Sequence, residues 1–189
     1  MQPVKANQGF TLVEVVVIAV IIGILAAIAA PSWLAILTRQ RLYNARANAL
    51  DKIREAQSQA IRTSRPWEVC FRDRNGFVEV SVQPGGRAYN CRNHTSWQSL
   101  MDSDARTVAI DPANTTSNPQ FGTNPTDGYS FRFGPFGDRA GLGGSDPQLV
   151  FIPRGQPRGP YYCVVAEGII GQVREGKLQR TNEGRLRCR

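Results

Sequence analysis

The 189-residue chain has few of the side chains on which enzymes most often depend. Its single histidine, His94, has no serine or cysteine motif beside it, and we expect it to lie in a surface loop. The glycine-rich stretch 134–144 lacks the lysine and the hydroxyl residue of a phosphate-binding loop. We therefore predict that the protein is not an enzyme and uses no cofactor.

Metal-binding spacings are also missing from the sequence. No two cysteines lie within four residues of each other, so none of the common zinc patterns is present. Asp102 and Asp104 are close enough together to suggest calcium, but the remaining ligands of an EF-hand loop are absent. The sequence thus predicts no metal site.

The cysteines are better explained as disulfides. An even number of cysteines fits a framework formed in an oxidising compartment, and four cysteines allow three pairings. We favour the two pairs that are nearest in sequence, each of which closes a loop of some twenty-odd residues and stabilises the fold by roughly 3 kcal/mol. These pairs are Cys70–Cys91 and Cys163–Cys188.

Charge is absent from residue 15 to residue 38, and Glu14 is the one charged residue within 10–38. As a helix of ~1.5 Å per residue, residues 10–37 would span about 40 Å, enough to cross a bilayer. A secretory signal peptide has a shorter apolar core, and a plain membrane anchor does not explain the acid. Thr11 and Glu14 also have the spacing of a helix capping box, which accounts for the start of a helix but not for the apolar run. An acid in such a segment indicates a function.

The stretch Gly9-Phe10-Thr11-Leu12-Val13-Glu14, with Pro31 further on, resembles the processing site of type IV pilins and type II secretion pseudopilins. The resemblance implies a leader at 1–9, cleavage after Gly9 by a prepilin peptidase, and N-methylation of Phe10. It also implies that residues 10–37 form a helix that lies first in the inner membrane and then in the filament core. Glu14 would pair there with the amino terminus of a neighbouring pilin, and Pro31 is a proline that these helices often carry.

The chain then changes its periodicity. A second helical part, at 38–65, has an apolar stripe at steps of three and four residues, and the charged residues between them form a solvated face. Pro66 should end it. The stripe consists of Leu42, Ala45, Ala49, Ile53, Ala56 and Ala60, and the solvated face of Arg39, Arg41, Arg46, Lys52, Arg54 and Arg62.

Short β-type runs follow in a globular head at 66–189. Residues 67–71 and 77–82 flank Asn75-Gly76, a pair typical of a tight hairpin turn. The pattern predicts an α+β fold in which one long helix packs on an antiparallel sheet, and the resemblance implies that this is the type IV pilin fold. Further strands are predicted at 107–110, 129–133, 149–152, 161–165 and 169–173.

The end of the chain is strongly basic. Six basic and two acidic residues between 174 and 189 give this stretch a net charge of +4, half of the chain's +8. Gly184-Arg185-Leu186-Arg187 resembles the G-R-x-R motif of FimT-type pilins, and residues 131–137 resemble a mid-domain segment of the FimT and GspH group. The resemblance implies that Arg185 and Arg187 contact DNA and that Gly184 shapes the approach. We assign Arg189, Arg180 and Lys177 to the same DNA site.

An extended chain at 185–189 would place Arg185, Arg187 and Arg189 on one face, with Leu186 and Cys188 pointing inward. Guanidinium groups suit phosphate oxygens, so the predicted binding of DNA is independent of sequence. The sequence thus favours a minor pilin that binds DNA for uptake in natural transformation. The alternative is a structural minor pilin or pseudopilin that primes filament assembly without DNA. In both cases the head lies on the periplasmic side and later on a pilus at the cell surface, with major and minor pilins as partners.

Overall fold

The computed structural model describes residues 10–85, 91–101, 105–116, 128–140, 146–156, 160–180 and 186–189. The chain divides into two compact units, Met1–Leu37 and Thr38–Arg189, and the helix α1 (Leu12–Thr63) contributes residues to both. The predicted leader with Gly9, the acidic pair at 102 and 104, and Gly184 and Arg185 of the predicted DNA site lie outside the described residues.

The first unit is a helix covered with apolar side chains. Thr11 begins it, since its hydroxyl accepts a hydrogen bond from the Glu14 N–H over 3.3 Å. Phe10 and Glu14 are both exposed, and the side chain of Pro31 lies outside the description. Within the described part of the chain, α1 is the one helix long and apolar enough to cross a membrane.

The second unit is built on the other half of α1. All six residues of the predicted stripe, from Leu42 to Ala60, are fully buried, which confirms the periodicity. The helix ends at Thr63, shortly before Pro66. Arg46 corrects the expectation of a solvated face, because it is only 7 % exposed. Its position four residues after Leu42 puts it at the edge of the stripe, where two tyrosines and an acid surround it.

The first of two antiparallel sheets has the strand order β3-β2-β1-β5. The predicted hairpin is confirmed, and Asn75 and Gly76 at its turn both have positive φ, 54° and 82°. The short strand β3 was not foreseen. The strands are β1 (Trp67–Arg74), β2 (Phe77–Pro84), β3 (Gln98–Ser99) and β5 (Tyr129–Phe133).

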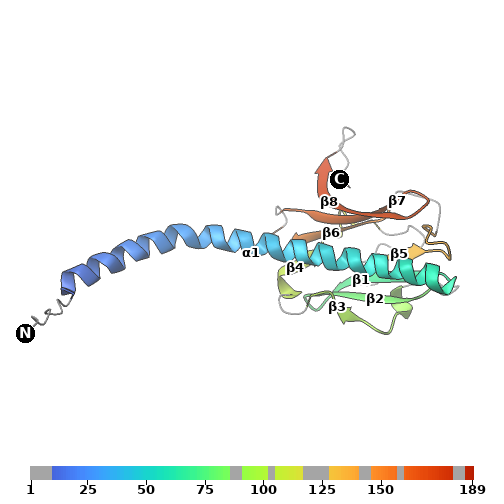
Figure 1. Cartoon of the computed structure of the whole chain (residues 1–189), viewed down its shortest axis with the longest axis horizontal. Coiled ribbons are helices and arrows are strands. Elements are labelled where there is room, and N and C mark those ends of the chain that lie inside the picture. Colours follow the sequence, from blue (N-terminus) through green and yellow to red (C-terminus); the bar gives the residue numbers. More distant parts are fainter. Residues whose placement is uncertain are drawn as a thin grey trace, which may run out of the picture. The chain divides into compact units, whose positions relative to one another are not determined.

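The second sheet has the order β4-β6-β7-β8-β9, so the single sheet expected from the sequence is in fact two. Figure 1 shows the second half of α1 running across both of them. Short 3-10 turns, η1 (Cys91–Asn93) and η2 (Ala105–Thr107), precede β3 and β4. The strands are β4 (Val108–Ile110), β6 (Gln148–Pro153), β7 (Tyr162–Glu167), β8 (Gln172–Arg180) and β9 (Leu186–Cys188).

The strand predicted at 169–173 is wrong for residues 169–171, and only residues 172 and 173 lie in a strand, β8. Residues 168–171 form the turn between β7 and β8, with Gly168 and Gly171 both at φ 66°. Ile169 and Ile170 between them are 67 % and 76 % exposed. The two glycines allow the left-handed backbone of a tight turn, which outweighs the β preference of two isoleucines.

The main core lies where α1 meets the inner faces of both sheets. A second, smaller apolar cluster of Val150, Cys163, Val165 and Cys188 covers the opposite face of the five-stranded sheet. Both disulfides have the predicted pairing, Cys70–Cys91 and Cys163–Cys188, each with a Cα–Cα distance of 5.7 Å.

Candidate nucleic-acid interface

The basic end of the chain pairs with β8. Gln179 lies opposite Arg187, and Leu178 lies opposite Cys188. One step further, Lys177 and Arg189 exchange two backbone hydrogen bonds, of 2.8 and 3.0 Å. This exchange makes Lys177 and Arg189 direct cross-strand neighbours.

Residues that lie opposite each other in an antiparallel pair point to the same face. The register therefore puts Lys177, Arg187 and Arg189 on one face, which we call the basic face. Cys188 is buried on the other face, and Leu186 is half-buried there.

Arg180 does not belong to the basic face. It lies opposite Leu186 in the register, and so it points to the same side as Leu186 and Cys188. The sequence argument had grouped it with the other arginines by charge alone.

Two contacts with other strands hold β9 in place besides its pairing with β8. The disulfide ties Cys188 to Cys163 of β7. The buried side chain of Gln148 accepts a hydrogen bond from the Cys188 N–H through Oε1, over 3.1 Å, and donates through Nε2 to the Asn114 carbonyl, over 2.7 Å. Gly176 leaves room for the backbone of Arg189, which an added Cβ would strike. No pattern in the sequence pointed to the role of Gln148.

The acid on the same face of β8 is already paired. Glu175 forms an ion pair with Arg46 of α1, with 3.2 Å between the carboxylate oxygen and the guanidinium nitrogen. The guanidinium of Arg46 also lies 4.6 Å from the ring centroid of Tyr43 and 5.2 Å from that of Tyr162. Lys177 contacts the ring of Tyr162, 5.8 Å from its centroid. None of the ion pairs between described residues involves the basic face.

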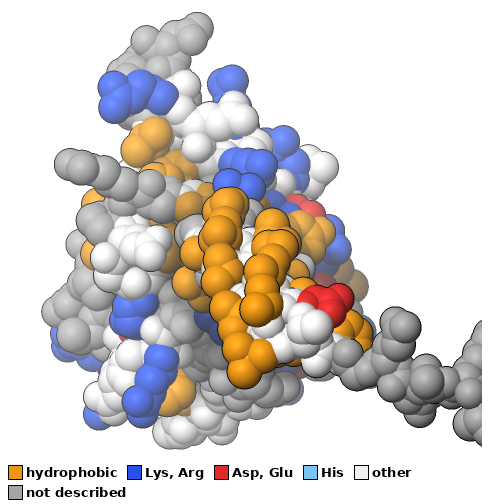
Figure 2. All heavy atoms as spheres, turned by 90° about the vertical axis from the view of Figure 1, so that its left-hand side faces the viewer, with side chains coloured by type: hydrophobic (Ala, Val, Ile, Leu, Met, Phe, Trp, Pro, Cys, Tyr) orange, Lys and Arg blue, Asp and Glu red, His pale blue; other side chains and the backbone are white. Residues whose placement is uncertain are grey.

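Like charges directly opposite each other destabilise an antiparallel pair. Lys177 and Arg189 are such a pair, and Arg187 lies two residues from Arg189 on the same face. An anion that contacts all three side chains would remove the repulsion. Figure 2 shows Lys and Arg side chains gathered on the upper part of the head, the side on which β8 stands in Figure 1.

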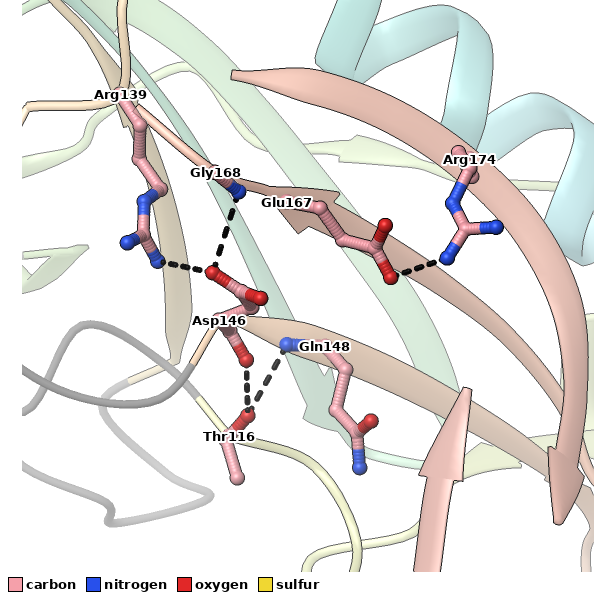
Figure 3. Close-up of polar contacts among 7 residues, drawn as sticks. All are labelled: Thr116, Arg139, Asp146, Gln148, Glu167, Gly168 and Arg174. Atoms are coloured by element: carbon pink, nitrogen blue, oxygen red, sulfur yellow. Dashed lines mark hydrogen bonds and ion pairs between the residues drawn. The ribbon is translucent and has the colours of Figure 1, made fainter. Parts of the chain in front are cut away.

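A groove of about 170 Å³ lies beside β9, and it is lined by Asp146, Gln148 and Glu167 and also by Leu186, Arg187 and Cys188 of the strand itself. Figure 3 shows Arg139 and the Gly168 N–H directed at one oxygen of Asp146, at 3.1 and 3.4 Å. Arg174 donates a hydrogen bond to Glu167. This hydrogen bond is the main reason that the pKa of the Arg174 guanidinium is raised, and the negative charge of Glu167 is the second reason. Paired carboxylates make the groove a poor site for a polyanion, so the basic face is the better one.

The architecture, one long helix with an apolar first half and a second half packed on antiparallel sheets, is that of a pilin-like α+β protein. Residues 4–30 match the family model for the prokaryotic N-terminal methylation motif. The match supports a type IV pilin-like protein, and it implies processing by a prepilin peptidase and assembly with other pilins. No curated protein and no solved structure matches the chain.

Proposed function

We propose that the protein is a minor type IV pilin that binds DNA, independently of its sequence, through the basic face of β8 and β9. Its role would be to capture DNA for uptake in natural transformation. Arg185, two residues before Arg187 in sequence, would extend the same site. The observation that carries the proposal is the cross-strand pair of Lys177 and Arg189, two like charges with no acid paired to either among the described residues.

The spacing of these cations is compatible with a DNA backbone. Residues two apart on a strand are ~6.6–6.8 Å apart along it, and two nucleotides of one DNA strand rise about 6.8 Å. Arg187 and Arg189 are separated by that step. Contacts of this kind are made to phosphates, which position a protein on DNA without reading bases.

The anchoring half of the proposal concerns the first unit. Cleavage after Gly9 would leave an N-methylated Phe10 as the new amino terminus. Glu14 would then lie in an apolar filament core, where a neighbour's amino terminus is the cation that offsets its charge. The head would face the periplasm before assembly and the cell surface afterwards.

Two substitutions test this anchoring role. Gly9→Val should leave the chain unprocessed in the membrane, and Glu14→Val should be processed and folded but poorly incorporated into pili. Mass spectrometry of the amino terminus and the pilin content of sheared filaments measure the two effects. A mature terminus near residue 31, or normal incorporation of Glu14→Val, would contradict it.

The DNA role is tested on the full chain in a non-ionic detergent. Arg187→Gln combined with Arg189→Gln should weaken binding to a labelled duplex by at least roughly tenfold, or 1.4 kcal/mol. The matched control is Arg54→Gln combined with Arg62→Gln, which removes the same charge from exposed positions of α1. The control should bind nearly as well as the wild type.

The outcomes separate the functions. Loss of binding in the first variant only, together with loss of transformation and normal piliation, supports DNA capture at the basic face. Equal loss in both variants means that net charge, not this site, attracts DNA. Unchanged binding in both variants would mean that DNA binds elsewhere than the basic face, and no binding by the wild type would leave the role in filament assembly without DNA.

A further inference from the structure

Two tyrosines lie beside the basic face, and the phosphate contacts of the proposed function do not use them. Tyr162 of β7 lies opposite Lys177 in the register of β7 and β8, and Lys177 is in turn the cross-strand neighbour of Arg189. Because residues opposite each other point to the same face, one ring and two cations form a row across three strands. The half-buried ring of Tyr162 therefore borders the basic face directly.

Tyr43 of α1 joins this row through a buried cation. The guanidinium of Arg46 lies 4.6 Å from the Tyr43 ring centroid and 5.2 Å from that of Tyr162, so one group contacts both rings. Arg46 is held in turn by its ion pair with Glu175 and by a hydrogen bond that it donates to the Gly176 carbonyl over 3.3 Å. The attraction between a cation and the face of a ring adds to this. The two rings, which we call the aromatic pair, are thus fixed beside β8.

The burial of these groups shows which of them can meet a ligand. Arg46 is only 7 % exposed and its charge is offset by Glu175, so it is not available to a phosphate. Tyr43 is 51 % exposed, so its ring contacts Arg46 and still offers surface to the solvent. Tyr162 links this ring to Lys177, whose ammonium lies 5.8 Å from the Tyr162 centroid.

A ring beside cations suits one form of nucleic acid better than the other. Cations bind the phosphates of single and double strands alike, whereas a ring binds a base only where the face of that base is free. In a duplex both faces of an inner base are covered by its neighbours in the stack. In a single strand a base can turn out of the stack and lie on a tyrosine ring, and every base has such a face. The aromatic pair therefore favours a single strand over a duplex.

We propose that the basic face and the aromatic pair together form a site for single-stranded DNA. Lys177, Arg187 and Arg189 contact phosphates, and a base stacks on the exposed ring of Tyr43. We thereby build on the proposed function, since the same cations bind the phosphates, and add the form of DNA that the site prefers. Duplex DNA uses the cations alone and binds more weakly.

Phe136 provides a matched control, because it is a still more exposed ring in another place. It is 89 % exposed and precedes Gly137, where an added Cβ would strike the side chain of Ile61. At 1.5 Å per residue, Ile61 lies about 27 Å further along α1 than Tyr43. Phe136 is therefore an exposed ring that lies away from the basic face.

The experiment measures the affinity of the full chain in non-ionic detergent for three labelled ligands of equal length. These are an oligo(dT) strand, which does not fold on itself, the same strand with every base removed, and the oligo(dA)·oligo(dT) duplex. The abasic strand has the same phosphates but nothing that can stack. We expect the intact strand to bind at least about fivefold more tightly than the duplex and at least about tenfold more tightly than the abasic strand.

Substitutions at Tyr43 locate the stacking contact. Tyr43→Leu keeps an apolar residue at this exposed position, and it should weaken binding of the intact strand by about tenfold while changing that of the abasic strand by less than about twofold. Tyr43→Phe keeps the ring and should bind the intact strand as the wild type does. Phe136→Leu should leave all three affinities unchanged.

The single-strand site is refuted if the wild type binds the intact and abasic strands equally, or binds the duplex more tightly than the intact strand. A loss in Tyr43→Leu that is the same for the intact and abasic strands would also refute it, because the ring would then act only through the fold. An equal loss in Phe136→Leu would mean that any exposed ring serves. The comparison of intact and abasic strands needs no substitution, so it tests the site even where a variant fails to fold.

A failure of this site can be told apart from a failure of the proposed function. Arg187→Gln with Arg189→Gln should weaken binding of all three ligands, because each of them offers phosphates. Where that variant weakens all three while the intact and abasic strands bind the wild type equally, DNA binding at the basic face stands and only the stacking contact fails. Where it changes none of the three affinities, the proposed function itself fails.

Discussion

The two disulfides close loops of nearly the same length but lie in opposite surroundings. The sequence separations are 21 and 25 residues, so the loop-entropy account gives each a stabilisation of roughly 3 kcal/mol. The Cys163–Cys188 bond is covered by valines and a leucine. The Cys70–Cys91 bond lies beside a buried acid and a buried histidine.

The difference shows that the role of a cross-link depends on its neighbours. On the apolar side, the bond fixes the short strand β9 and thereby the direction of Arg187. On the polar side, the bond holds a 3-10 turn over groups whose hydrogen bonds are incomplete. Removing either disulfide should lower the free energy of unfolding by a similar amount, whereas the two removals should have different effects on DNA affinity.

The largest effect is expected for Cys163→Ala with Cys188→Ala. The pair should lose roughly 3 kcal/mol of the free energy of unfolding, because the unfolded chain gains freedom. DNA affinity should also fall by about tenfold, since β9 no longer holds the basic face. Urea unfolding and a duplex titration of the folded protein measure the two effects. Unchanged DNA affinity would mean that strand pairing alone positions the arginines.

Cys70→Ala with Cys91→Ala should lose a similar amount of stability, again roughly 3 kcal/mol. Its DNA affinity should stay within about twofold of the wild type, which is under 0.5 kcal/mol, because no residue of the basic face touches this bond. The same two measurements apply. A loss of DNA binding as large as in the first pair would erase the distinction between the two bonds.

Gln148→Met tests whether Gln148 helps the Cys163–Cys188 disulfide to hold β9. The substitution removes the acceptor of the buried Cys188 N–H and the donor to the half-buried Asn114 carbonyl. We expect a loss of about 1–3 kcal/mol in the free energy of unfolding and a smaller loss of DNA affinity than the disulfide variant shows. Thermal unfolding with the disulfides intact measures it. A neutral result would show that the disulfide holds β9 without Gln148.

Glu68→Met removes the buried acid beside the Cys70–Cys91 disulfide and should have the smallest effect on stability. The substitution removes a buried carboxylate with an unsatisfied oxygen and keeps a similar volume, so the oxidised protein should be no less stable than the wild type. Urea unfolding under oxidising conditions checks this. A loss above about 1 kcal/mol would show that Glu68 stabilises the oxidised fold.

The sequence was most informative where the cause is local. The buried stripe of α1, the Asn75-Gly76 hairpin and the extent of β5 all follow from periodicity or turn chemistry within a few residues. The disulfide pairing was also correct, because the nearest cysteines are those that the fold brings together. Arg187 and Cys188 point to opposite faces of β9, as the geometry of any strand requires.

The failures have a common cause in distant contacts. His94 is buried because the disulfide brings η1 onto β1, and no linear spacing reveals that Cys91 and His94 meet Glu68 and Cys70. Arg46 is buried because Glu175, on a distant strand, offsets its charge. Arg180 was grouped with the wrong face because its register depends on how β9 pairs with β8.

The salt dependence of DNA binding tests the central claim most directly. If Lys177, Arg187 and Arg189 each neutralise one phosphate, the logarithm of the affinity should fall against the logarithm of salt concentration with a slope near about −2.7. In Arg187→Gln with Arg189→Gln the slope should be near about −0.9, and in the Arg54→Gln with Arg62→Gln control it should stay at the wild-type value. Equal slopes in the wild type and the first variant would contradict DNA binding at the basic face.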